Sequence, residues 1–88
     1  MKFFGYSFET TNDLKNLIEI GKISITNRDY VNYHNIYQYC CGHGTPKMLE
    51  YLDSFGKIDV NIILDKKGWN CYFTAAYWDN TENMKYLE

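Results

Sequence analysis

The feature that most constrains the fold of this chain is an internal repeat. When the sequence is shifted by 35 positions it matches itself, so that residues 21–25 (GKISI) fall on residues 56–60 (GKIDV). In the same register, Asn35 falls on Asn70. A fixed period of this length is typical of solenoid proteins, in which each unit packs only against its neighbours. We therefore expect stacked units rather than one central core.

Each period contains the pattern of two short helices. The first should begin after Asn35 and again after Asn70, because asparagine side chains accept backbone N–H groups as N-caps. The second should begin at Thr45 and Pro46, a capping hydroxyl followed by a proline at the first helical position, and should end at Gly56. The spacing of the apolar residues predicts which of them form the core. These residues are Tyr37, Cys40, Cys41, Met48, Leu49, Leu52, Phe55, Tyr72, Ala75, Ala76 and Tyr86.

A short β-branched segment follows Gly21, and another follows Gly56. The second segment ends in residues 65–68 (DKKG), which are typical of a turn. This pattern predicts a hairpin or loop that projects from the unit.

Residues 65–76 (DKKGWNCYFTAA) resemble the ankyrin repeat, whose motif runs D-x-x-G-x-T-P-L-H-x-A-A, and residues 45–52 (TPKMLEYL) are similar to its second helix. The Asn-, Tyr- and Lys-rich composition is similar to that of divergent ankyrin arrays from giant DNA viruses and AT-rich protists. The resemblance implies an all-α, ankyrin-like solenoid of stacked helix–turn–helix repeats with hairpin or loop fingers. It divides the single domain 1–88 into a degenerate partial repeat (1–29), a full repeat (30–64) and a truncated repeat (65–88).

The sequence departs from the family pattern in several places. Its period is 35 residues, where ankyrin repeats have about 33. Tyr33 stands where Gly68 lies in the next copy, and T-P-L-H is replaced by NIYQ (35–38) and NCYF (70–73). The last copy stops at Glu88, within the expected second helix. We therefore expect an uncapped C-terminal end through which the chain can self-associate.

Composition excludes several kinds of partner. A net charge of −2 and a pI near 5.6 lack the basic excess of nucleic-acid-binding proteins, so no nucleic acid is expected. No apolar run approaches the roughly 20 residues of a membrane span, so no membrane is expected either. Three cysteines are an odd number, which argues against a disulfide framework and favours a reducing compartment. We expect a cytoplasmic protein, in the host-cell cytoplasm if it is viral.

Metal or nucleophilic chemistry would depend on the cysteines and histidines. The residues with soft ligand atoms are His34, Cys40, Cys41, His43 and Cys71. The adjacent pair Cys40 and Cys41 would point in different directions from a helix, and it occupies positions filled by alanines in the next copy. Residues 42–44 (GHG) lack the Gly-Lys-Ser/Thr of a phosphate-binding loop and fit a turn between helices. We therefore expect buried core cysteines, no metal, no cofactor and no enzymatic activity.

The resemblance also implies a binding surface on the concave side of the solenoid. The positions that would form it are Val31, Asn32, His34, His43, Lys66, Lys67, Trp69, Tyr77 and Trp78. Exposed Trp and Tyr beside Lys are favoured at protein interfaces, so we expect a non-enzymatic protein–protein interaction module with a protein partner. Two alternatives to this interpretation stay open. In the first, the aromatic residues pack against a further repeat that is missing from this chain. In the second, the chain is a structural capping or spacer fragment of a longer ankyrin array and has no binding site of its own.

Overall fold

The protein is described by a computed structural model, which covers residues 1–26, 28, 35–56 and 66–88. Among these residues, in chain order, lie β1 (Lys2–Phe3), β2 (Tyr6–Ser7), α1 (Thr11–Glu19), α2 (Ile36–His43), α3 (Pro46–Asp53), α4 (Cys71–Tyr77) and α5 (Thr81–Leu87). The described part is mostly helical, as the sequence predicts. The short antiparallel pair β1–β2 is not predicted by the sequence analysis.

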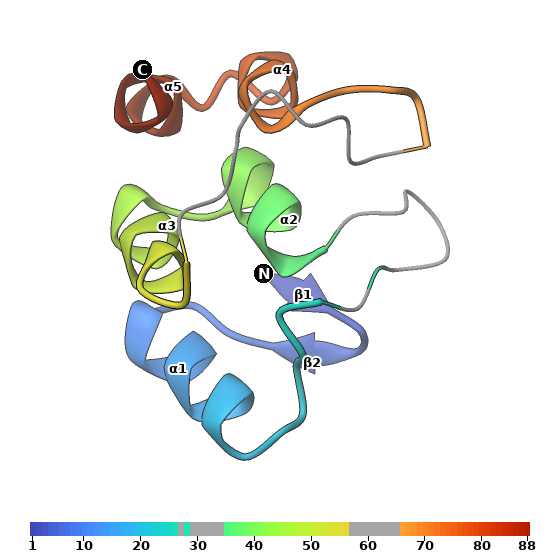
Figure 1. Cartoon of the computed structure of the whole chain (residues 1–88), viewed down its shortest axis with the longest axis vertical. Coiled ribbons are helices and arrows are strands. Elements are labelled where there is room, and N and C mark those ends of the chain that lie inside the picture. The colour runs from blue at the N-terminus through green and yellow to red at the C-terminus, as the bar shows by residue number, and fades with distance from the viewer. Residues whose placement is uncertain (27, 29–34, 57–65) are drawn as a thin grey trace.

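The helices form two parallel rows (Figure 1). One row holds α5, α3 and α1, and the other holds α4, α2 and the β1–β2 hairpin. Neighbours within a row pack against each other, most extensively α2 against α4, and α2–α3 and α4–α5 pack across the rows. Helices of seven to nine residues are marginal on their own in water, so this packing is what keeps them folded.

The helix starts repeat with the period of the sequence. Thr10, Thr45 and Asn80 cap α1, α3 and α5 and are 35 residues apart, and Asn35 and Asn70 cap α2 and α4 at the same spacing. At each cap the side-chain oxygen accepts a hydrogen bond from the backbone N–H three residues later. The predicted starts of α2, α3 and α4 are therefore confirmed.

The β1–β2 hairpin occupies the place in its row where the 35-residue spacing would put another helix. Phe4 (φ 52°) and Gly5 (φ 82°) both have left-handed backbone conformations, which end any helix and turn the chain back on itself. The backbone N–H of Lys2 donates to the Tyr39 hydroxyl at 2.8 Å, and the Phe3 ring packs 5.3 Å from that of Tyr39. The hairpin thus covers the side of α2 that faces away from α4.

Most of the expected core residues are buried, among them the cysteines at 40 and 41. Three expectations are wrong. Phe55 is 51% exposed because α3 ends at Asp53 and the chain has already turned toward solvent. Tyr86 is 37% exposed because its hydroxyl reaches out to Asp53, and Ala76 is exposed on the side of α4 away from α2.

The glycines expected to end the second helix of each unit have the required conformation. Gly21 (φ 79°) follows α1, and Gly56 (φ 136°) follows α3. Gly68 (φ 79°) follows a turn at Lys66 and Lys67, where a turn is predicted. The rest of the predicted hairpin, residues 57–65, lies outside the described residues.

Asn80, the N-cap of α5, and Asn83 within α5 join the end of α2 to the last unit. The Asn83 amide Nδ2 donates to the carbonyl oxygens of Cys40 (2.9 Å), Cys41 (2.9 Å) and Gly44 (3.2 Å). The Asn80 Nδ2 donates to the carbonyls of Gly42 (3.2 Å) and Gly44 (3.1 Å). The Cys40 carbonyl also accepts the Gly44 N–H at 2.8 Å, whereas the carbonyls after it come at the end of the helix, where the helical pattern supplies no donor. The asparagine amides therefore replace the water that burial of α2 excludes.

Replacing Asn83 with leucine, which has a similar volume but no donor, should lower the free energy of unfolding by about 1–3 kcal/mol. The reason is that the Cys41 carbonyl loses the Asn83 donor, while Cys40 and Gly44 keep bonds from Gly44 and Asn80. Urea unfolding followed by circular dichroism measures this loss. The control Asn12→Leu, at an exposed position of α1, should change stability by less than about 0.5 kcal/mol. Equal stability of the two variants would show that the amide bonds add nothing net.

A tyrosine–carboxylate hydrogen bond joins α2 to α3, and a second one joins α4 to the end of α5. The Tyr37 hydroxyl of α2 donates to Asp53 Oδ2 at 3.2 Å, and 35 residues later the Tyr72 hydroxyl donates to Glu88 Oε1 at 3.4 Å. Asp53 Oδ2 also accepts from Tyr86 of α5 at 2.6 Å, which links neighbouring units. Burial, together with the Asp53 charge, raises the pKa of Tyr37, and burial with the hydrogen bond to Asp53 raises the pKa of Tyr86 to about 12.

These raised pKa values predict that stability falls in alkali. An unfolded tyrosine ionises near pH 10, whereas folded Tyr37 and Tyr86 keep their protons beyond that pH. The unfolded state then binds fewer protons than the folded state, so the free energy of unfolding decreases as the pH rises from about 10 toward 12. Tyr37→Phe and Tyr86→Phe should each flatten this slope in urea unfolding at several pH values. If stability depended on pH in both variants as it does in the parent chain, these two tyrosines would not be the cause of the alkaline loss of stability.

Candidate functional site

A continuous row of aromatic rings crosses from α2 to α4. Its members, which we call the aromatic row, are Tyr39, His43, Trp78, Tyr77 and Trp69. Consecutive ring centroids lie 4.9, 4.5, 5.2 and 4.7 Å apart in that order. Such tilted and edge-on contacts are the preferred arrangements of aromatic pairs, so the rings support one another.

Each ring is positioned by a local feature of the backbone. Tyr39 and His43 are four residues apart on α2 and therefore share a face of that helix. Trp78 is the C-cap of α4, and Trp69 lies immediately before the N-cap Asn70. The buried Gln38 amide holds the Trp69 backbone in place, because its Nε2 donates to the Trp69 carbonyl at 2.8 Å.

Gly42 lets the Trp78 ring approach α2. A Cβ atom added at Gly42 would lie 2.7 Å from Trp78 Cδ1 and 3.3 Å from Thr74 Cγ2, closer than side chains normally pack. The missing side chain therefore allows α4 and its terminal ring to lie directly on the α2 backbone. This is a structural use of Gly42. The prediction that residues 42–44 form a turn between helices is wrong for Gly42 and His43, because α2 continues through His43 and only Gly44 lies outside it.

The aromatic row packs against the protein on one side and is exposed to solvent on the other. Tyr77 is 57% exposed and Trp78 50% exposed, and His43 is also exposed. The Lys67 ammonium lies 4.8 Å from the Trp69 ring centroid and 5.8 Å from that of Tyr77, within the range of cation–π attraction. The result is a rigid aromatic surface with a positive charge at one end.

Five of the residues predicted for the site meet in this surface: His43, Lys67, Trp69, Tyr77 and Trp78. Lys66 is exposed in the turn beside Lys67. Val31, Asn32 and His34 lie outside the described residues. Tyr39 is not among the residues predicted for the site, although its spacing of four residues from His43 on α2 indicates that the two rings share a face.

The cysteines pack in the core, as predicted. Cys40, Cys41 and Cys71 are free thiols and fully buried. Burial raises the pKa of Cys40 to about 12, and burial with the neighbouring Cys71 thiol raises the pKa of Cys41. Thiols in this state are poor nucleophiles and poor ligands. Across residues 1–26, 28, 35–56 and 66–88, no three Cys, His, Asp or Glu side chains come together as a metal site would require.

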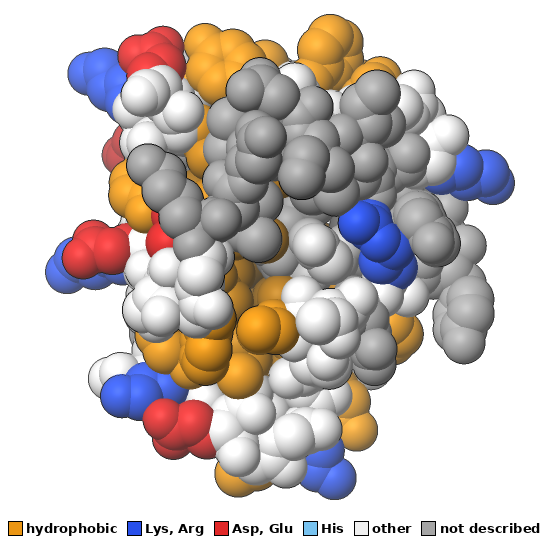
Figure 2. Space-filling model, viewed as in Figure 1, with side chains coloured by type: hydrophobic (Ala, Val, Ile, Leu, Met, Phe, Trp, Pro, Cys, Tyr) orange, Lys and Arg blue, Asp and Glu red, His pale blue; other side chains and the backbone are white. Residues whose placement is uncertain are grey.

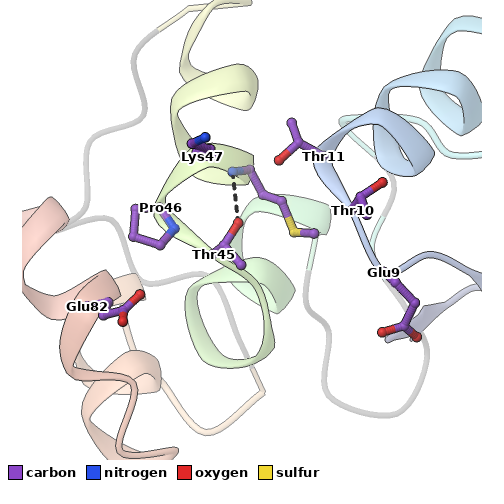
Figure 3. Close-up of a pocket in the computed structure, with 8 residues that line it drawn as sticks. Glu9, Thr10, Thr11, Thr45, Pro46, Lys47 and Glu82 are labelled. Atoms are coloured by element: carbon purple, nitrogen blue, oxygen red, sulfur yellow. Dashed lines mark hydrogen bonds between the residues drawn. The ribbon is translucent and has the colours of Figure 1, made fainter.

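A hollow of about 500 Å³ lies on the opposite row, between the starts of α1 and α3 (Figure 3). Glu9 and Thr10 line it from the α1 side, Thr45 and Lys47 from α3, and Glu82 from α5. The helix ends that face it are already capped, since Thr10 accepts the Asp13 N–H and Thr45 the Met48 N–H. Two glutamates and one lysine line the hollow, so its charge does not favour an anion.

A smaller hollow of about 340 Å³ separates α2 from the end of α3. Its walls include the apolar side chains of Ile25, Ile36, Leu52 and Phe55. Figure 2 shows hydrophobic side chains reaching the surface on this face of the molecule. The described residues that line this smaller hollow include no charged side chain. The aromatic row, which combines exposed rings with a lysine, is therefore the stronger candidate site.

Comparisons with protein-family models, curated proteins and solved structures found no match to this chain. None of the helices in the described ranges combines the length and the apolar character needed to cross a bilayer.

Gly42→Ala should displace the Trp78 ring, because the new methyl group takes its place. In a Trp69→Phe background, where Trp78 is the sole tryptophan, we expect emission at longer wavelength and stronger quenching by acrylamide. In the matched Trp78→Phe background, the emission of Trp69 should stay the same. Unchanged Trp78 emission would show that the ring does not rest on Gly42.

Proposed function

We propose that this chain is a non-enzymatic protein-interaction module that binds a partner protein through the aromatic row. The observation that carries the proposal is the row itself: rings locked together at 4.5–5.2 Å that nevertheless leave Tyr77 and Trp78 half exposed. Large exposed aromatic side chains are unusual on a surface that has no partner. Held rigidly, they lose little conformational entropy on binding, which is why Trp and Tyr dominate interface energetics.

The arrangement of the helices supports the finer proposal of an ankyrin-like solenoid. Two rows of short helices with caps at 35-residue intervals are what stacked helix–turn–helix units would give. In that arrangement the aromatic row lies along the inner helices α2 and α4, on the side expected to bind. Buried free thiols suit a reducing compartment, so we place the protein in the cytoplasm.

A second candidate is a structural capping or spacer unit with no binding site of its own. The exposed apolar side chains of α4, such as Phe73 at 52%, favour it, because they suit packing against a further unit. In that case the aromatic row would contribute only to stability.

Capture of proteins from a cell extract by the immobilised chain, with the bound amounts measured, distinguishes the interaction module from the structural unit. Proteins retained by the parent chain should be lost with Tyr77→Ala, which removes a side chain more exposed than that of Trp78. A weakening of roughly 2 kcal/mol is expected for an interface hot spot. The control variant, Lys47→Ala with Glu50→Ala on the outer helix α3, should retain them. Circular dichroism of all variants checks that the fold persists.

The outcome that contradicts binding through the row is retention of the same proteins by the parent, the Tyr77→Ala variant and a Trp78→Ser variant alike. Loss of binding in the control only would place the site on the outer row.

A further inference from the structure

The side of α2 and α4 that carries the aromatic row stays exposed where the two helices pack together. Gly42 is buried in that contact, since a Cβ atom there would lie 2.7 Å from Trp78 Cδ1. The next residue, His43, is exposed although its ring lies 4.5 Å from that of Trp78. Trp78 occupies the position of His43 one period later and is half exposed. Packing of one unit on the next therefore leaves this side of the helices accessible to a ligand.

The aromatic row presents hydrogen-bond donors as well as ring surfaces. No hydrogen bond within the described ranges uses the indole N–H of Trp78 or the hydroxyl of Tyr77. An indole N–H can only donate, so a ligand that covers Trp78 has to supply an acceptor. A suitable ligand thus combines apolar side chains for the rings with acceptors that are not already bonded.

Lysines lie at both ends of the row. At one end the Lys67 ammonium is 4.8 and 5.8 Å from two of the ring centroids. At the other end Lys2 is exposed, and its backbone N–H donates to the Tyr39 hydroxyl. An acidic residue, Asp79, directly follows Trp78 in the middle of the row. This distribution of charge favours a ligand with acidic groups at its ends and an uncharged middle.

We propose that the aromatic row binds an extended, proline-rich segment of a partner protein, in the polyproline II conformation, with acidic residues at its ends. This inference rests on the function proposed for the row and specifies the kind of partner. Proline-rich segments of this conformation dock on surfaces lined by aromatic side chains, because their shape is preformed and little entropy is lost on binding.

The spacing of the rings suits such a segment. A polyproline II helix has three residues per turn and rises about 9 Å per turn. Consecutive rings of the row are 4.5–5.2 Å apart, so alternate rings lie no farther apart than about one turn. Every third residue of the segment can therefore pack on a ring. Its backbone carbonyls have no internal hydrogen bonds and can accept the Trp78 N–H.

Two other kinds of ligand fit less well. The carbonyls of an amphipathic helix are bonded within the helix, so they offer no acceptors along its length. Single-stranded nucleic acid also stacks on aromatic rings, but the net charge of −2 and the carboxylate of Asp79 oppose a phosphate backbone.

Titration of the whole chain with a synthetic peptide tests the proposal. The peptide has about twelve residues, most of them proline, with a glutamate at each end and no aromatic side chain. Trp69 and Trp78 are the two tryptophans of the chain, so their emission should shift to shorter wavelength and saturate as the peptide covers them. Trp78→Phe keeps a ring but loses the N–H and should weaken binding, measured by calorimetry, about three- to tenfold.

A change of charge tests the role of the lysine. Lys67→Glu should weaken binding of this peptide roughly tenfold. A peptide with lysine in place of the glutamate at one end should bind this variant more tightly than it binds the parent. The matched control, Lys47→Glu on the outer helix α3, should bind the original peptide like the parent. Circular dichroism of each variant checks that the fold persists.

Three results of the titration would overturn the proposal. They are no saturable change at millimolar peptide, equal affinity for a peptide with alanine in place of every proline, and tighter binding of an oligothymidine strand. The second would indicate a helical ligand and the third a nucleic acid.

Competition separates this inference from the proposed function. The proline-rich peptide should release the cell proteins whose capture depends on Tyr77. Proteins that are captured through Tyr77 but are not released by the peptide overturn the inference alone. Proteins retained equally by Tyr77→Ala contradict the proposed function instead.

Discussion

The end of α2 is where the structure is most constrained. This helix is buried between the hairpin, α3 and α4, so its last carbonyl groups cannot be left to water. Asn83, itself fully buried, supplies one amide to three of them, and Asn80 supplies another while its own oxygen caps α5. Two polar side chains thus fix how the unit of α4 and α5 lies on the unit before it.

The aromatic row depends on that placement. With α4 held on α2, the Trp78 ring lies over Gly42 and against His43, and the row continues through Tyr77 to Trp69. Gln38 contributes from the same buried layer by holding the Trp69 carbonyl. A polar interior layer therefore determines the geometry of an apolar surface. This division of roles is common where hydrogen bonds specify the arrangement of elements and aromatic contacts supply binding energy.

The two ends of the molecule differ because the repeated units have different sequences at matching positions. At the front, the turn at Phe4 and Gly5 replaces an inner helix with a hairpin, whose Lys2 and Phe3 cover Tyr39. At the back, the positions that match buried residues carry exposed apolar side chains such as Phe73. The described part of the chain therefore has a hairpin over one end of its rows and exposed apolar side chains at the other.

The sequence by itself determined the helices and their spacing. Helix ends depend on hydrogen bonds and backbone conformations that involve only a few neighbouring residues. The caps at Asn35, Thr45 and Asn70 and the glycines that end helices can therefore be predicted from the local sequence. The burial of Cys40 and Cys41 also followed from the repeat. The tertiary structure alone decided the rest. Whether Ala76 or Tyr86 is buried depends on which neighbouring unit covers it, and the link from His43 to Trp78 joins residues 35 apart through the packing of α2 on α4. These features depend on contacts between units, and helical periodicity within one unit does not encode them.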